Sequence, residues 1–83
     1  MRIAHNYILC SLLKAHEVNG FMQNLDPPHL VYVKHDSYDN DYSYFTLSVG
    51  DVVYTVRKPE DYVRTVHDTF IIPLGEVVGV ERL

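Results

Sequence analysis

The chain is poor in the residues that build cross-links and catalytic loops. It has one cysteine, Cys10, four glycines and no tryptophan among its 83 residues. A single cysteine excludes an intramolecular disulfide and a zinc site made of several thiolates, and it fits a reducing compartment. The sequence also lacks a phosphate-binding glycine loop, a Gly-x-Ser-x-Gly motif and a His-Glu-x-x-His motif, which are common catalytic signatures.

Long hydrophobic runs are missing as well. The longest one, residues 7–13, is followed within four positions by Lys14, His16 and Glu17. A membrane-spanning helix needs about 20 apolar residues, and no small-residue cleavage site follows this run. The sequence therefore predicts a cytoplasmic protein with neither a membrane span nor a secretory signal.

The overall balance is that of a folded globular protein, with 47% hydrophobic and 22% charged residues. A chain of this length predicts one domain over residues 1–83. The formal net charge is -4, and most of the acidic residues lie after residue 35. Negative charge repels phosphate backbones, so the composition disfavours general nucleic-acid binding and favours a protein partner with a basic surface.

The N-terminal segment shows apolar residues at helical spacing, which predicts a helix over residues 4–18. The residues on this face are Ala4, Ile8, Leu12 and Ala15. Gly20 could end this helix, because glycine readily takes the left-handed conformation at the first position past a helix. The helix could also continue to Leu25. In either case the Asp-Pro-Pro sequence at residues 26–28 ends it, because proline cannot continue a helix.

The rest of the chain favours strands, because β-branched and aromatic residues dominate it. The predicted strands cover residues 30–35, 42–49, 51–58, 63–72 and 77–80. Residues 59–69 are ambiguous, since Pro59 and the two acids after it also suit the first turn of a helix. The predicted fold class is α+β: an N-terminal helix followed by a twisted antiparallel meander or small open barrel over residues 30–82.

This order of elements resembles the layout of Sm-like and SH3-like small barrels. A helix-covered antiparallel meander has the same order, so the resemblance concerns layout alone. A small barrel would suit nucleic-acid binding as an alternative function. The residues for that alternative are the basic side chains Arg57, Lys58 and Arg64, which two acidic residues interrupt.

The most unusual stretch is residues 35–45, which holds three carboxylates and three tyrosines. Tyrosine is enriched at protein interfaces, and surrounding carboxylates can steer a basic partner. The predicted partner-binding residues are Asp36, Tyr38, Asp39, Asp41, Tyr42 and Tyr44. Calcium loops need a turn glycine and a terminal glutamate, and the stretch has neither. We therefore expect no metal and no cofactor.

Catalysis is not expected, because the five histidines form no convincing acid–base pair. His16 and His67 each have an adjacent carboxylate, but adjacent residues point to different faces of an element. The sequence thus predicts a non-enzymatic binding module, comparable in size and charge with phage-encoded anti-defence or host-takeover inhibitors of nucleic-acid-handling complexes. A third alternative is a structural subunit that forms homo-oligomers through its sheet edges.

Overall fold

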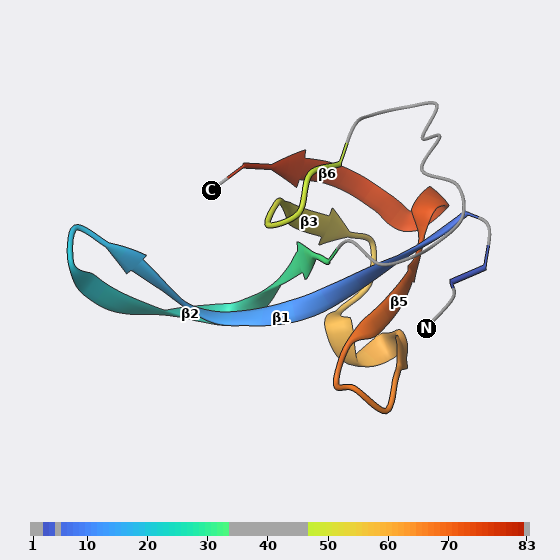
Figure 1. Cartoon of the computed structure of the whole chain (residues 1–83), viewed down its shortest axis with the longest axis horizontal. Coiled ribbons are helices and arrows are strands. Elements are labelled where there is room, and N and C mark those ends of the chain that lie inside the picture. The colour runs from blue at the N-terminus through green and yellow to red at the C-terminus, as the bar shows by residue number, and fades with distance from the viewer. Residues whose placement is uncertain (1–2, 5, 34–46, 83) are drawn as a thin grey trace.

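A computed structural model describes residues 3–4, 6–33 and 47–82 of the chain (Figure 1). The strands are β1 (Tyr7–Val18), β2 (Phe21–Tyr32), β3 (Val52–Thr55), β4 (Val63–Arg64), β5 (Phe70–Pro73) and β6 (Val77–Glu81). Two three-residue 3-10 turns, η1 (Pro59–Asp61) and η2 (Leu74–Glu76), are the helical elements of these ranges. None of the helices described is long and apolar enough to cross a membrane.

The predicted N-terminal helix is wrong, because residues 7–18 form strand β1. β1 lies in the interior of the sheet, where it pairs with β5 over its first residues and with β2 along most of its length. Consecutive residues Ile8, Leu9 and Cys10 are all buried, so this part of the strand is covered on both faces. The described fold is therefore an antiparallel sheet, and not α+β.

Asn19 and Gly20 form the turn between β1 and β2, and do not end a helix. Both have positive φ, 52° and 83°, as the two central residues of a type I′ hairpin turn require. Val18 and Phe21 pair directly on either side of the turn. The Asn-Gly sequence therefore starts a hairpin at the place where we expected the chain to leave a helix.

Replacing Gly20 with alanine is expected to lower the free energy of unfolding by about 1–2 kcal/mol, because a side chain disfavours the left-handed conformation. Space is not limiting, since an added Cβ would meet no atom within 4 Å. Gly75→Ala is the matched control: this position is equally open and lacks a positive φ. Urea denaturation of both variants measures the difference, and equal losses would contradict the turn geometry.

The sheet is strongly curled. Its strand order is β4-β5-β1-β2-β3-β6, so the consecutive strands β5 and β6 are separated by three others. In a flat sheet their four spacings would add up to about 19 Å. The connecting turn η2 has three residues and rises only about 2 Å per residue, so the sheet must bend to bring its two sides together. This order also corrects the predicted simple meander.

Backbone hydrogen bonds hold η2 to both sides of the curled sheet. The Leu74 N–H donates to the Asn6 carbonyl, which precedes β1, and the Val56 N–H donates to the Glu76 carbonyl. Val56 follows β3, so η2 bridges the β1 side and the β3 side. The core lies inside this curl and consists of Ile8, Cys10, Leu30, Tyr32, Val53, Tyr62, Phe70 and Ile72. Leu12, which lies on the apolar face of the predicted helix, is only half-buried against this core.

The ambiguous segment 59–69 contains both a short helical turn and a strand. Pro59–Asp61 forms η1, and Val63–Arg64 forms β4, which pairs with β5. The predicted single strand over residues 63–72 is wrong, because residues 65–69 form a turn between two strands. The segment predicted as a strand at residues 51–58 contains β3, and the one predicted at residues 77–80 covers all of β6 except Glu81.

Candidate binding groove

The residues predicted to bind a partner lie outside the described part of the chain. These are Asp36, Tyr38, Asp39, Asp41, Tyr42 and Tyr44. Most of the predicted strand over residues 42–49 also lies there, and the described residues 47–50 at its end are not in a strand. The prediction that this stretch contacts a partner therefore stays a prediction.

The described residues form an open groove of about 860 Å³ between the sheet and the crossover from β3 to β4. Its apolar lining comes from core residues and their neighbours: Leu12, Leu30, Val53, Tyr62 and Phe70. Four of these five are buried, so they form the floor of the groove. The walls come from β2, from the segment around η1 and from the β4–β5 turn.

A bulge in β2 builds one wall. The β1–β2 register passes from Leu13 opposite His29 to Ala15 opposite Asn24, so residues 25–28 face Lys14 alone. The two prolines in this stretch have no N–H to donate to a neighbouring strand, which favours a bulge there. We expected the Asp-Pro-Pro sequence to link helix and sheet, but it lies within β2 and lines the groove.

Basic residues predicted as one patch do line the same groove: Arg57, Lys58 and Arg64. The pairing of β1 with β2 adds Lys14, which sequence proximity could not reveal. Acidic residues Asp26, Glu60 and Asp68 line the groove as well. The groove is therefore lined by charges of both signs and has little surplus positive charge.

Two of the cations are held by acids. The Arg57 Nε lies 3.1 Å from Glu76 Oε1, and Arg64 pairs with Asp68 in the β4–β5 turn. Lys14 and Lys58 form no ion pair with the described acids. Within the described residues, Lys14 and Lys58 are thus the cations best placed to meet a ligand.

Aromatic rings add a contact surface on the β2–β3 side. The rings of His29 and Tyr54 lie 5.9 Å apart at 59° to each other. The Tyr54 hydroxyl donates a hydrogen bond to Glu81 Oε1 at 2.7 Å. This bond, desolvation and the Glu81 charge raise the pKa of Tyr54, so the phenol stays neutral. Tyr54 is 40% exposed and can therefore contact a ligand.

The crossover that carries η1 is fixed by Tyr62. The Tyr62 hydroxyl accepts a hydrogen bond from the Arg57 N–H at 3.2 Å and donates one to Glu76 Oε1 at 3.1 Å. Together with the Arg57–Glu76 ion pair, these bonds tie the crossover to η2. This groove wall therefore has a defined position in the absence of a ligand.

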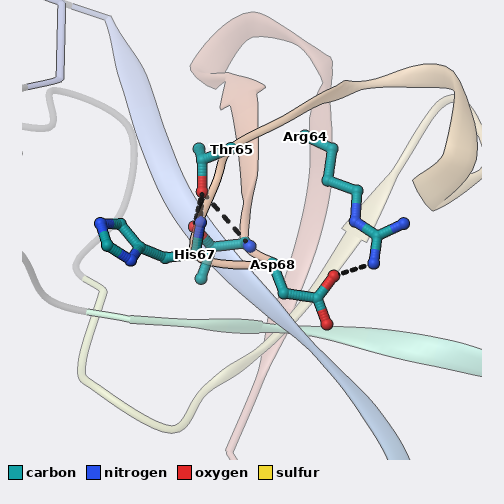
Figure 2. A network of polar contacts seen from close by, with 5 residues as sticks. Arg64, Thr65, His67 and Asp68 are labelled. Atoms are coloured by element: carbon teal, nitrogen blue, oxygen red, sulfur yellow. Dashed lines mark hydrogen bonds and ion pairs between the residues drawn. The ribbon is translucent and has the colours of Figure 1, made fainter.

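The β4–β5 turn is fixed by Thr65 (Figure 2). The Thr65 N–H donates to the Thr69 carbonyl at 2.8 Å, and the two threonine hydroxyls lie 2.7 Å apart. The backbone N–H groups of His67 and Thr69 both point at the Thr65 hydroxyl. This network holds Asp68 in its left-handed conformation and places its ion pair with Arg64 at the groove.

No three histidine, cysteine, aspartate or glutamate side chains in residues 3–4, 6–33 and 47–82 converge as metal ligands. The stretch that we considered for calcium, which contains Asp36, Asp39 and Asp41, lies outside these ranges.

Comparisons of the chain with protein-family profiles, with curated proteins and with solved structures found no match. The functional argument therefore depends on the groove itself.

Proposed function

We propose that the protein is a cytoplasmic, non-enzymatic binding module that holds an extended segment of a protein partner in its groove. The observation that carries this proposal is the combination of an apolar floor with walls that bear both charge signs. Peptide segments offer apolar side chains and charges of either sign, and small-molecule and peptide sites are typically apolar with a few fixed polar groups. The exposed ring of Tyr54 provides an anchor of the kind that dominates protein interfaces.

Nucleic-acid binding is the second candidate, and one observation favours it: Arg57, Lys58 and Arg64 line one groove. Proteins that bind single strands combine such cations with aromatic rings. Here three lining acids and Glu76 offset the four lining cations, so the electrostatic attraction for a phosphate backbone is weak. We therefore rank a peptide above a nucleic acid.

The net charge of -4 suggests the chemistry around the bound segment. An acidic protein attracts basic partners over distances of about 10 Å at ~0.1 M salt. We propose that apolar residues of the partner occupy the groove while basic residues flank it. The acidic tyrosine stretch of residues 35–45 would add to this attraction. Complexes that handle nucleic acids have basic surfaces, so we propose that the protein acts as an inhibitor of such a complex, as some phage proteins do.

A random dodecapeptide library displayed on phage tests this proposal. Panning on the purified protein is expected to enrich apolar residues flanked by lysine or arginine. Binding of an enriched synthetic peptide, measured by calorimetry, is expected to weaken in Tyr54→Ala by about 2 kcal/mol or more, as for an interface anchor. Val66→Ala is the matched control, because Val66 is 95% exposed and does not line the groove.

Three outcomes would contradict the peptide proposal. Panning could enrich no motif, or the enriched peptides could bind Tyr54→Ala as tightly as the unaltered protein. The third outcome is that a 15-nucleotide oligo-dT binds more tightly than the enriched peptide. Its affinity would then fall steeply as the salt concentration rises, and it would also fall in Lys58→Ala. That result would favour the nucleic-acid candidate, because phosphate contacts make binding salt-dependent.

A further inference from the structure

The ring of Tyr54 lies at the rim of the groove, against β6. Tyr54 pairs with Gly79 in the β3–β6 ladder, and Val52 pairs with Glu81. A Cβ added at Gly79 would lie 3.8 Å from Cδ2 of the Tyr54 ring, so the ring rests on the β6 backbone at this glycine. Residues two apart on a strand share a face, so Glu81 lies beyond Gly79 on the same face. The Tyr54 hydroxyl reaches it and donates a hydrogen bond to Oε1 at 2.7 Å.

The position of the Tyr54 ring is therefore fixed before any ligand binds. The β6 backbone covers one side of it, Glu81 holds the hydroxyl, and the His29 ring lies 5.9 Å away on β2. The side chain is nevertheless 40% exposed. A side chain that is already ordered loses little conformational entropy when a ligand contacts it. The exposed part of the ring is thus a preformed contact surface.

The carboxylate of Glu81 carries a charge that the described residues do not neutralise. The described ion pairs use other acids, namely Asp51, Asp68 and Glu76. Arg82 follows Glu81 in the sequence, but its Nε lies 3.9 Å from Asp51 Oδ1. A carboxylate has about four acceptor sites, and the Tyr54 hydroxyl uses one of those on Glu81. An exposed negative charge therefore lies beside an exposed aromatic ring.

We propose that Tyr54 and Glu81 form a subsite for an arginine side chain of the bound partner. This inference rests on the proposed function, in which basic residues flank the segment in the groove. A cation is attracted to the face of an aromatic ring, and a neighbouring carboxylate adds a charge-assisted hydrogen bond. The guanidinium of arginine is planar, so it can stack on the Tyr54 ring while the N–H groups at its edge reach Glu81. The compact ammonium of lysine suits this combination less well.

Asp26 and Glu60 are the competing acids, because both line the groove and neither belongs to a described ion pair. Each has a lysine that can supply a counter-charge. Lys14 faces the bulge that contains Asp26, and Lys58 lies two residues before Glu60. Glu81 differs from both in its hydrogen bond to an exposed aromatic ring. The combination of ring and carboxylate therefore favours Glu81 as the acid that binds the arginine.

A double-mutant cycle between peptide and protein tests the subsite. An arginine of an enriched peptide is replaced with citrulline, which has nearly the same shape and no charge. Loss of the ring contact and of the ion pair predicts about 3- to 30-fold weaker binding by calorimetry. Glu81→Gln keeps an oxygen for the Tyr54 hydroxyl and is expected to reduce the ratio of the two affinities by about 2- to 5-fold. Glu17→Gln is the matched control, because it removes the same charge near the tip of the β1–β2 hairpin, outside the groove.

A small probe tests the subsite without a peptide. The NMR signals of the Tyr54 ring are expected to shift more with Nα-acetyl-arginine methylamide than with the citrulline derivative at the same concentration. Glu81→Gln should remove this difference, whereas Glu17→Gln should retain it. Equal shifts from the two derivatives would overturn the subsite, and so would a difference that persists in Glu81→Gln.

The subsite and the groove proposal can fail separately. Peptides that bind through Tyr54 with the same arginine-to-citrulline ratio in Glu81→Gln would overturn the subsite and leave the groove proposal in place. The subsite is also wrong if Asp26→Asn or Glu60→Gln reduces the ratio in place of Glu81→Gln, or if the enriched peptides contain lysine but no arginine. If panning enriches no peptide and the arginine derivative still shifts the Tyr54 signals selectively, the groove proposal is wrong and the subsite stands.

Discussion

Ile72→Ala is expected to lower the free energy of unfolding by about 2–5 kcal/mol, the cost of removing a large side chain from a closed core. Ile72 lies in β5, is fully buried and pairs with Ile8, which is 1% exposed. The truncation would leave a cavity between strands that the curl of the sheet brings together. Since small domains have a total stability of about 5–15 kcal/mol, the loss should be evident in urea denaturation.

Leu12→Ala is the matched comparison for this prediction. Leu12 is half-buried and lines the groove, so water can enter the space that its side chain leaves. We expect a loss below about 2 kcal/mol, at the low end for a large-to-small change. The sequence alone placed Leu12 on the apolar face of a predicted helix, where burial would be expected. A loss for Leu12→Ala equal to that for Ile72→Ala, at an unchanged denaturant slope, would mean that the groove is closed at this position.

Strands β3 and β6 could be predicted because their local signals agree. Residues 52–55 and 77–80 are rich in β-branched residues; Gly50 and Asp51 precede the first segment, and Glu76 and Glu81 flank the second. β1 was missed because a short apolar run suits either a helix or a strand buried on both faces, and periodicity alone cannot separate them. The Asn-Gly pair at residues 19–20 held the missing information, since it is the strongest short-range signal for a hairpin.

The groove could be predicted only in part. Arg57, Lys58 and Arg64 were grouped because they are near in sequence, and they do line the groove. Lys14 and His29 reach it through the β1–β2 pairing and the bulge at residues 25–28. The position of that bulge follows from pairing across the whole hairpin. The residues that complete the groove are therefore determined by pairing between strands that are distant in the sequence, and local sequence patterns do not predict that pairing.

Cys10 is expected to react with a thiol reagent at least about 1,000-fold more slowly in the folded protein than in urea at pH 8. Burial raises the pKa of the Cys10 thiol from 9.0 to about 12, which lowers the thiolate fraction by about that factor. Cys10 is fully buried in the core, so access is also restricted. Absorbance of a disulfide-exchange reagent measures both rates. A folded rate within tenfold of the unfolded rate would mean that β1 opens easily around Cys10.

The raised pKa of the Cys10 thiol is also expected to make the folded protein less stable at high pH. The thiol is an acid whose pKa is higher in the folded state, so the folded state favours its neutral form. The contribution is therefore fully present below about pH 9 and is lost as the pH rises toward 12. Comparison with Cys10→Ala separates this effect from the titration of tyrosines and lysines, which both proteins share. The difference in the free energy of unfolding between the unaltered protein and Cys10→Ala should be constant from pH 6 to 8. Above about pH 9 the unaltered protein should lose stability relative to Cys10→Ala. A constant difference up to pH 11 would show that the Cys10 thiol ionises as readily in the folded protein as in the unfolded chain.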